Sequence, residues 1–498
     1  MSDAPTPSTP DDRDRPPDTP PPDRPPPDRP PPDRPPRGWS DRVRYGRGGG
    51  GYAYRPDQLL CADLAALNAA RELGLDGDVD TIEVVDGDDH YVLNAFGDVP
   101  ALVAELRARG HRVEPNYVLF ATAVSANPVY ANPVYANPVY ANPVYANPVY
   151  ANPVYANGSG SFANPVYANP VYASPVYANP VYANPVYANA YICDGLRPST
   201  ARPAPAPEKA PAPYGEPSGS PKVVVLDTGI SDEKHCPAML KALAKEYPQW
   251  SEIPDGQDPA NPEDGFLDPS SGHGTFIAGL VHQLAPGHAI VPVRVIAPFG
   301  DVAVSDVVAA IEALRKNKTL DDHTVVNMSF GGYADAEMDV LSSAVRRVRK
   351  TGAAVVASAG NDGTDRPLFP ACLPDVVAVA ALDPYGPAAY TNHGAWVDAC
   401  APGTDLVSAF YEYDGKMELP PMPGSADPDH YEQWARWTGT SFAAPVVAAA
   451  LLRQMAVAGG TAEDAVDRVV RSEGLFRIPG LGTVVNLSPA EPGCLATG

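Results

Sequence analysis

Residues 223–229 read Val-Val-Val-Leu-Asp-Thr-Gly, and this stretch decides the fold class. Its first four residues form an apolar run, which is typical of a strand buried on both faces of a parallel sheet. Comparable runs lie at 291–296, 324–328, 353–357 and 376–380. Helical patterns separate them. The alternation predicts an α/β fold, a three-layer doubly wound and mostly parallel sheet with functional residues near the strand ends.

The segments between these strands show the spacing of helices, with apolar residues recurring every three or four positions. One such segment runs over 304–314 and another over 338–348. A third helix is expected to begin at His273. A fourth is expected to follow Ser441, with Pro445 in its first turn, where a missing N–H is tolerated.

Three short motifs place an acid, a base and a hydroxyl in this region. Asp227 ends the first strand, His273 lies in Ser-Gly-His-Gly-Thr at 271–275, and Ser441 lies in Gly-Thr-Ser-Phe-Ala-Ala-Pro at 439–445. A hydroxyl becomes a good nucleophile when a base takes its proton and a carboxylate orients that base. Taken singly, Asp227 is better explained as a helix or turn cap and His273 as a structural histidine, and Ser441 is also compatible with a helix N-cap. Together they predict nucleophilic catalysis.

The residues that flank His273 and Asp227 carry further information. The glycines beside His273 are expected to let a substrate backbone approach the ring. Asp-Thr-Gly is also the signature of aspartic peptidases, in which two carboxylates share a proton. The sequence contains this tripeptide once, at 227–229, so that mechanism would require a homodimer. The hydroxyl mechanism is favoured.

In order and framing, the motifs resemble those of the subtilisin-like (subtilase) serine peptidases over roughly residues 217–490. The resemblance implies a serine endopeptidase acting on proteins or peptides through an acyl-enzyme. By the same resemblance, Asp227 orients the imidazole, His273 acts as general base and then acid, and Ser441 attacks the scissile carbonyl.

Two further segments extend the resemblance. Ser-Ala-Gly-Asn-Asp-Gly at 358–363 contains Asn361, which the resemblance implies donates its amide to the oxyanion. The segment Ser329-Phe330-Gly331 is similar to the one that pairs with substrate as an antiparallel strand, so these residues are expected to bind substrate. Asn327 is a rival amide, but a structural role at the end of its strand is favoured.

By composition the chain divides into four stretches. Residues 1–52 combine a Pro-Pro-Pro-Asp-Arg repeat with a Gly-rich tract and are predicted to be a disordered Pro/Gly-rich arm. Residues 53–122 are predicted to form a small α+β domain. Residues 123–215 are dominated by Ala-Asn-Pro-Val-Tyr repeats, and residues 216–498 hold the predicted catalytic domain.

The α+β pattern of 53–122 consists of a helix expected over Leu60–Ala70, a pair of strands, a second helix and a last strand at 112–120. The run Val-Glu-Pro-Asn-Tyr at 113–117 resembles part of a subtilase propeptide. That resemblance implies an intramolecular folding aid and transient inhibitor whose tail enters the active cleft. The protein is accordingly expected to be a self-processing zymogen with its own propeptide-like module as a partner.

The repeat tract at 123–215 is predicted to be an extended linker. A five-residue period also suits a β-helix, but proline cannot donate to a strand ladder. Tyrosine in every unit makes this tract a candidate surface for a partner. A second class of function therefore stays open: the chain could be an interaction protein that binds through its repeats and has an inert peptidase domain. A third is a peptidase delivered by its repeats.

Charge and cysteine usage limit the remaining classes. The formal net charge of −24 argues against nucleic-acid and anionic-membrane partners, which need cationic patches. The six cysteines show no disulfide framework or metal spacing, and Cys400 is expected to be a core residue. The acidic positions 76–80 lack the glycine and glutamate of a calcium loop. No cofactor or metal is therefore expected, although the resemblance to subtilases keeps calcium open.

The N-terminal residues lack a basic region followed by an apolar stretch, so a secretory leader is not visible. The apolar runs fall short of the roughly 20 residues that cross a bilayer. These observations predict a cytoplasmic protein, with leaderless export left open.

Overall fold

The computed structural model describes residues 43–46, 51–94, 97–121, 201–207, 212–215, 221–252, 267–268, 270–297, 300–415 and 430–487. They belong to one compact unit, Arg37–Gly498. The predictions for the arm at 1–52 and for the repeats at 123–215 lie almost entirely outside the described residues.

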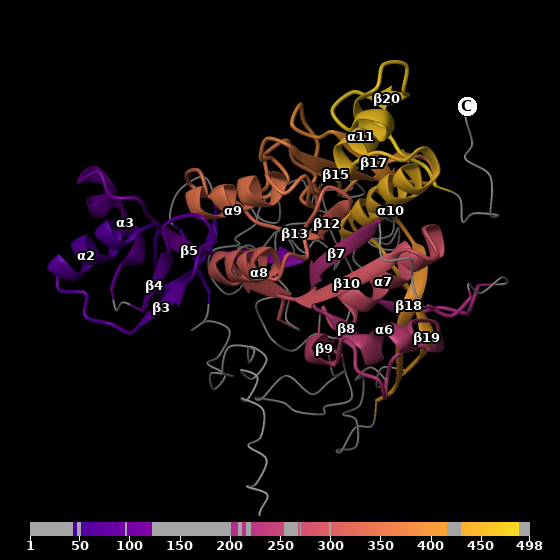
Figure 1. The fold of residues 1–498 in the computed structure, drawn as a ribbon, viewed down its shortest axis with the longest axis horizontal. Coiled ribbons are helices and arrows are strands. Elements are labelled where there is room, and N and C mark those ends of the chain that lie inside the picture. The colour runs from indigo at the N-terminus through magenta and orange to yellow at the C-terminus, as the bar shows by residue number, and fades with distance from the viewer. Residues whose placement is uncertain are drawn as a thin grey trace, which may run out of the picture. The chain divides into compact units, whose positions relative to one another are not determined.

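The larger sheet is mostly parallel and has the strand order β10-β7-β12-β14-β15-β17-β21-β20 (Figure 1). Its strands are β7 (Lys222–Asp227), β10 (Ala289–Arg294), β12 (Thr324–Met328), β14 (Ala354–Ser358), β15 (Val376–Asp383), β17 (Ala399–Pro402), β20 (Arg477–Ile478) and β21 (Gly482–Val484). β10 and β12 flank β7 on opposite sides, so the strand order reverses there. Doubly wound sheets bind ligands outside the carboxyl ends of the strands at such a point. Asp227 ends β7 there, and Ser329 follows β12.

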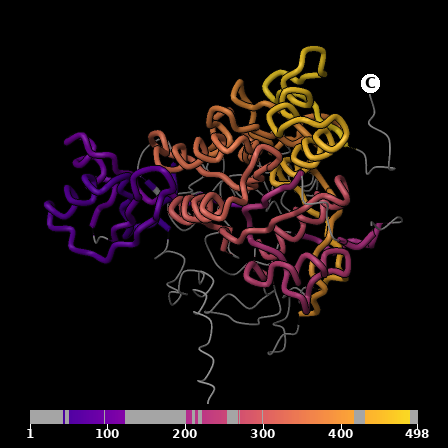
Figure 2. The backbone as a smooth tube through the Cα atoms, viewed as in Figure 1, coloured from indigo at the N-terminus to yellow at the C-terminus, as the bar shows by residue number. Residues whose placement is uncertain are grey.

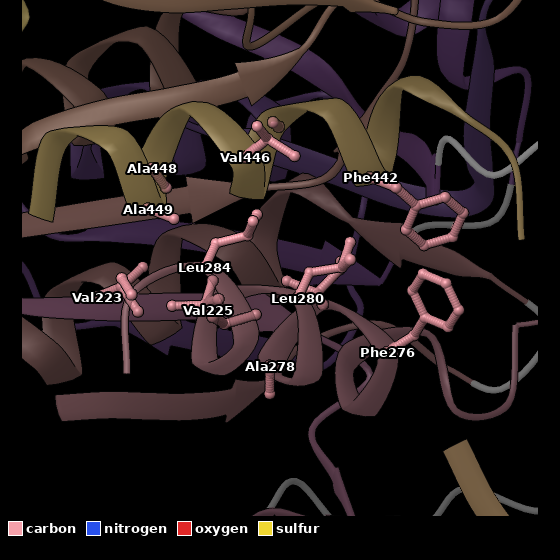
Figure 3. Close-up of a cluster of buried hydrophobic side chains, with 14 of the residues drawn as sticks. Val223, Val225, Phe276, Ala278, Leu280, Leu284, Phe442, Val446, Ala448 and Ala449 are labelled. Carbon is pink, nitrogen blue, oxygen red and sulfur yellow. The ribbon is translucent and has the colours of Figure 1, made fainter. Parts of the chain in front are cut away.

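Helices cover both faces of this sheet, as the period-two alternation of β7 requires. They are α7 (His273–Leu284), α8 (Val304–Lys316), α9 (Asp339–Arg349) and α10 (Thr440–Ala458). Val223 and Val225 share a core with α7 and α10, whose distant sequence segments lie side by side (Figures 2 and 3). Val224 and Leu226 share the opposite core with α8 and α9. The predicted three-layer doubly wound fold is confirmed.

Helix α10 begins at Thr440, so Pro445 lies inside the helix and the prediction that it falls in the first turn is wrong. Proline has no N–H, so the Ser441 carbonyl lacks its usual helical donor. The Ser329 hydroxyl donates to that oxygen at 2.7 Å instead. Asn327 in turn donates to Ser329 Oγ at 2.9 Å, in keeping with the structural role expected for it. The helix start is thereby tied to the end of β12.

Among the described residues, α10 is long and apolar enough to cross a bilayer by length and composition, contrary to the expectation from the apolar runs. It lies in the core, with 72% of the relevant window buried, and packs on α7 and on the sheet. This burial accounts for its apolar composition.

A second sheet has the order β11-β5-β2-β4-β3, with β1 also on β2 and β13 also on β5. Its elements and the two helices beside them are β1 (Arg44–Tyr45), β2 (Ala53–Cys61), α2 (Leu64–Glu72), β3 (Val79–Ile82), β4 (His90–Asn94), α3 (Val99–Ala108), β5 (Val113–Ala121), β11 (Asp301–Ala303) and β13 (Phe330–Gly331). The expected strand pair is present as β3 and β4. The helix predicted from Leu60 is wrong at its start, because Leu60 lies in β2 and Asp63 caps α2 through the Ala66 N–H.

The remaining elements are short, apart from the paired strands β18 and β19, which pack against α7. They are β6 (Arg202–Pro203), β8 (Ile230–Ser231), α6 (Lys241–Glu246), β9 (Ser251–Glu252), β16 (Gly386–Pro387), β18 (Leu406–Asp414), β19 (His430–Trp437), α11 (Ala462–Val466), 3₁₀ turns at Ala238–Leu240 and Pro248–Trp250, and a π-helical turn at Asp467–Arg471.

The last strand of the N-terminal part, β5, pairs with two strands that belong to the C-terminal part of the chain. It is antiparallel to β11, with Val302 opposite Leu119, and to β13, with Phe330 opposite Ala121. The Ala121 N–H also donates to the Gly300 carbonyl at 2.8 Å. The end of β5 therefore lies between the two strands, hydrogen bonded on both edges.

Two side chains of β5 satisfy the open N-termini of α8 and α9. The Ser305 N–H at the start of α8 donates to Asn116 Oδ1 at 3.1 Å, and Asn116 Nδ2 donates to Ser305 Oγ at 2.9 Å. Glu114 Oε2 accepts from the N–H of Asp339, the first residue of α9, at 2.9 Å. Burial raises the pKa of Glu114 to about 8. The N–H groups in the first turn of a helix have no partner within that helix, so Asn116 and Glu114 supply the acceptors that Ser305 and Asp339 need.

Replacing the cap on α8 is expected to destabilise the protein. In a Ser441→Ala background, Asn116→Ala leaves the buried Ser305 N–H without an acceptor and lowers the free energy of unfolding by about 1–3 kcal/mol. Urea denaturation followed by tryptophan fluorescence measures the change. Ser305→Ala removes the Ser305 hydroxyl but keeps the hydrogen bond from its N–H to Asn116 Oδ1, so it serves as the control. An Asn116→Ala protein with the parent's unfolding midpoint would contradict this account.

Candidate active site

Asp227 and His273 form a buried pair at the carboxyl end of β7. The Nδ1–H of His273 donates to Asp227 Oδ1 at 2.7 Å, and both residues are 0% exposed. The Thr228 N–H donates to the same oxygen at 2.8 Å. This arrangement assigns the proton to Nδ1 and leaves Nε2 as the basic atom. Nε2 is buried and has no hydrogen-bond partner among the described residues.

Aromatic rings surround the imidazole. Trp437 meets it edge-on with ring centroids 5.4 Å apart, and Phe442 lies at 5.2 Å. Phe442 also packs against Phe276 at 4.6 Å, and Figure 3 shows these two rings facing each other from α10 and α7. Because Phe442 directly follows Ser441 in the chain, the start of α10 lies beside the start of α7.

The Ser441 hydroxyl is engaged by the main chain in this structure. It donates to the Ser329 carbonyl at 3.0 Å, and Ser441 is 0% exposed. The expected hydrogen bond from Ser441 to His273 Nε2 is not formed, although the residue after Ser441, Phe442, packs against the His273 ring.

Asn361 is hydrogen bonded to Thr440, the residue before Ser441. Its Oδ1 accepts from the Thr440 N–H at 3.0 Å and from the Thr440 hydroxyl at 2.9 Å. A backbone N–H can only donate, so this contact identifies the accepting atom as oxygen and fixes the orientation of the amide. The Gly360 N–H donates to the Thr440 hydroxyl at 3.2 Å, which holds that hydroxyl in turn.

The segment expected to bind substrate is already paired with a strand of the same chain. Phe330 and Gly331 form β13 and lie opposite Ala121 and Phe120 of β5. The side chain of Ser329 points instead into the interior, where it joins Asn327 to the Ser441 carbonyl. The side chain of Ser329 therefore has a structural role.

The glycines of the motifs are explained by packing within the chain. Gly229 has φ +95°, and a Cβ on Gly274 would lie 2.3 Å from the Gly229 carbonyl oxygen. Gly272 has φ +78°, and a Cβ there would lie 2.4 Å from the Phe410 ring. Both positions therefore need glycine for packing within the chain, Gly272 against the Phe410 ring and Gly274 against the loop after β7.

Two residues of this region were missed by sequence reasoning. Thr440 orients Asn361, and its place beside Ser441 in the Gly-Thr-Ser motif was a usable signal. Glu252 is 0% exposed and accepts hydrogen bonds from Thr228 and Gly272, the neighbours of Asp227 and His273. Burial raises the pKa of Glu252 to about 8. No motif surrounds Glu252.

In the part of the chain that the structure describes, no group of three or more His, Cys, Asp or Glu side chains is placed to hold a metal ion. The cysteines described there, at positions 61, 236, 372 and 400, are unpaired thiols, and Cys400 is buried in β17.

Comparison with known proteins agrees with this geometry. The profile of the Subtilase family of peptidases matches residues 218–477, just over half of the chain. The chain is 31% identical over 248 residues to the thermophilic serine proteinase of Bacillus sp. (strain AK1), covering 47% of this chain and 52% of that protein. It is 30% identical over 245 residues to subtilisin BL of Lederbergia lenta, covering 47% of this chain and 76% of that enzyme.

A third relative is the subtilisin-like serine protease Pen ch 13 of Penicillium rubens, 33% identical over 210 residues, which are 40% of this chain and 47% of that protein. The chain thus spans about half the length of the Bacillus and Penicillium relatives. A solved cold-adapted subtilisin-like serine proteinase aligns with 58% of this chain and 95% of its own at a TM-score of 0.40 and 23% identity, too weak a similarity to add to the assignment.

The prediction of a cytoplasmic protein is wrong. The subtilisin and alkaline-protease relatives are secreted extracellular enzymes. The prediction rested on a leader that was not seen near Met1, and an absence of that kind carries no positive information about the compartment.

The orientation of Asn361 is expected to depend on the Thr440 hydroxyl. Thr440→Val removes one of the two donors to Asn361 Oδ1, so the rate of Ser441 phosphonylation by a fluorophosphonate falls by about three- to tenfold, the worth of one ordinary hydrogen bond. Thr440→Ser keeps the hydroxyl and should stay close to the parent. Equal labelling rates in Thr440→Val and the parent would remove Thr440 from this role.

Proposed function

The chain belongs to the subtilase family, and on that premise we propose that it is a serine endopeptidase that hydrolyses internal peptide bonds of proteins. Asp227, His273 and Ser441 form its catalytic triad. The observation that carries the proposal is the buried Asp227–His273 hydrogen bond of 2.7 Å, which leaves Nε2 as the basic atom, next to the segment that carries Ser441.

In the first step the Ser441 hydroxyl leaves the Ser329 carbonyl, and His273 Nε2 takes its proton as Oγ attacks the scissile carbonyl. Asp227 keeps Nδ1 protonated and stabilises the imidazolium that forms. The same proton then passes from Nε2 to the leaving amine, and the acyl group remains on Oγ. Water attacks this ester with His273 again as base, which restores Ser441 and releases the acid product.

The oxyanion of each tetrahedral intermediate is stabilised by the Asn361 amide and the Ser441 N–H. Support for this role comes from the orientation of the amide: its oxygen accepts from Thr440, which identifies the opposite side of the amide as the N–H side. Losing one such donor lowers turnover by about 10²–10³ in subtilisin, a member of the same family, and Asn361 is expected to contribute on that established scale.

The experiment that tests the proposal is active-site labelling. A fluorophosphonate probe is expected to label the wild-type protein and not Ser441→Ala, because the probe reacts only with an activated serine. Circular dichroism shows whether both proteins are folded. A folded wild-type protein that takes no label and cleaves no casein would instead favour the alternative of an inert peptidase domain serving as an interaction module.

We further propose that the protein is a self-processing zymogen whose residues 53–122 act as a propeptide. Support comes from β5, which pairs as an antiparallel strand with β13, the segment proposed to bind substrate, and with β11. A substrate strand would make the same main-chain hydrogen bonds. The module would then inhibit the enzyme until it is cut and released.

The register of β5 predicts where the chain is cut. Phe330 lies opposite Ala121, the last described residue of β5, and Ser329 directly precedes Phe330 in the chain. Because Ser441 Oγ contacts the Ser329 carbonyl, we expect cleavage between Thr122 and Ala123. N-terminal sequencing of the matured protein should therefore read Ala-Val-Ser.

The control for this prediction is Ser441→Ala, which should remain uncut under the same conditions. A mature N-terminus beyond residue 200 would contradict the register, and it would mean that the repeats at 123–215 are removed together with the module.

A further inference from the structure

Glu252 is a buried carboxyl that the proposed mechanism does not use. It ends β9, which pairs in parallel with β8, so that Ser231 lies opposite Glu252. The Asp232 N–H donates to the Glu252 carbonyl at 2.9 Å, which fixes its backbone against the segment that follows Asp227. The residue is 0% exposed.

Its two carboxyl oxygens bridge the two loops that carry the acid and the base. Thr228 Oγ1, on the residue after Asp227, donates to Oε2 at 2.9 Å. The N–H of Gly272, the residue before His273, donates to Oε1 at 3.2 Å. The carboxyl group therefore contacts one neighbour of each member of the Asp227–His273 pair.

A further contact closes the arrangement. The Gly274 N–H, on the other side of His273, donates to Thr228 Oγ1 at 3.0 Å. Since that hydroxyl donates its only proton to Glu252, it is free to accept from Gly274. Glu252, Thr228 and the first turn of α7 thus form a cyclic network around the Asp227–His273 hydrogen bond.

A contribution to the stability of the fold does not by itself explain a buried carboxyl group at position 252. Burying it out of water is costly even when it is hydrogen bonded, and apolar residues of similar volume often serve a core equally well. The charge of nearby Arg294 lowers the pKa of Glu252, but the effect of burial is larger; Nη1 of Arg294 also donates to the Ser251 carbonyl at 3.1 Å. What the carboxyl group does supply is two acceptors, placed to fix two backbone segments relative to each other.

We propose that Glu252 is a positioning residue for peptide-bond hydrolysis, holding the Asp227 loop against the start of α7 so that His273 keeps its orientation. This inference rests on the proposed peptidase function. Displacing a catalytic group by about 1 Å can lower the rate about 10²-fold, so a tether between the two loops has a direct effect on turnover.

Two substitutions of graded severity test the proposal. Glu252→Gln keeps the shape and one acceptor, and kcat is expected to fall about tenfold, as for the loss of one hydrogen bond. Glu252→Leu removes both acceptors, and kcat is expected to fall about 10²-fold. Both values are taken per active site, titrated with the fluorophosphonate, on a peptide substrate. KM should stay within about twofold, because the network does not touch the substrate-binding strand.

The matched control is Glu312→Gln. Glu312 is a buried glutamate, 3% exposed, that pairs with Arg315 and Arg347 on the other side of the sheet. Glu312→Gln replaces a buried carboxyl group that contacts neither the Asp227 loop nor the start of α7, so kcat per titrated site should not change. Thr228→Val removes the donor on the Asp227 side and should lower kcat about tenfold; it decides the question if the Glu252 variants do not fold.

The proposal is supported if kcat and the labelling rate of Ser441 fall together in the order wild type, Glu252→Gln, Glu252→Leu. It is overturned if the folded Glu252 variants, or Thr228→Val in their place, stay within twofold of wild type per titrated site. It is also overturned if Glu312→Gln lowers kcat as much as the Glu252 variants do, or if the Glu252 variants change KM and leave kcat unchanged. A wild-type protein that takes no label refutes the peptidase function itself, a distinct result.

Discussion

Contact between the loop after β7 and the first turn of α7 is the constraint on which the rest of the site depends. The carbonyl of Gly229 lies so close to Gly274 that a Cβ on Gly274 would be 2.3 Å from it. At that separation Asp227 Oδ1 and His273 Nδ1 reach 2.7 Å in a buried setting, where a hydrogen bond is electrostatically stronger than in water. Glu252 and Thr228 bridge the same two loops through side chains.

Ser441, the proposed nucleophile, is held in a different way, through an interruption in its own helix. Pro445 removes the N–H that would have bonded the Ser441 carbonyl, and Ser329 supplies the missing donor from the end of β12. Asn327 supports Ser329, and Thr440 holds Asn361 beside the same turn. The start of α10 is therefore anchored to two strand ends, and the reacting groups are carried by rigid elements rather than by a free loop.

The N-terminal module uses the hydrogen-bonding rules of a sheet to reach this site. Its strand β5 fills the space between β11 and β13, while Asn116 and Glu114 satisfy the helix starts of α8 and α9. Backbone pairing is insensitive to side-chain identity, so a segment of the chain itself can occupy the place that we propose for substrates. Side-chain caps then give the module its orientation.

By itself the sequence determined the α/β class and the order of the strands along the chain, and it predicted Asp227, His273, Ser441 and Asn361 as site residues. These follow from local patterns, namely apolar runs, helical spacing and short motifs. It misplaced the helix start at Leu60, which sits in β2 although its spacing suits a helix. Two features were decided by tertiary structure alone. Ser329 replaces a missing helical donor, and Gly274 allows α7 to contact the loop after β7 at Gly229. Tertiary structure also brought Glu252 between these two segments, because contacts between residues distant in the chain leave no periodic trace in the sequence.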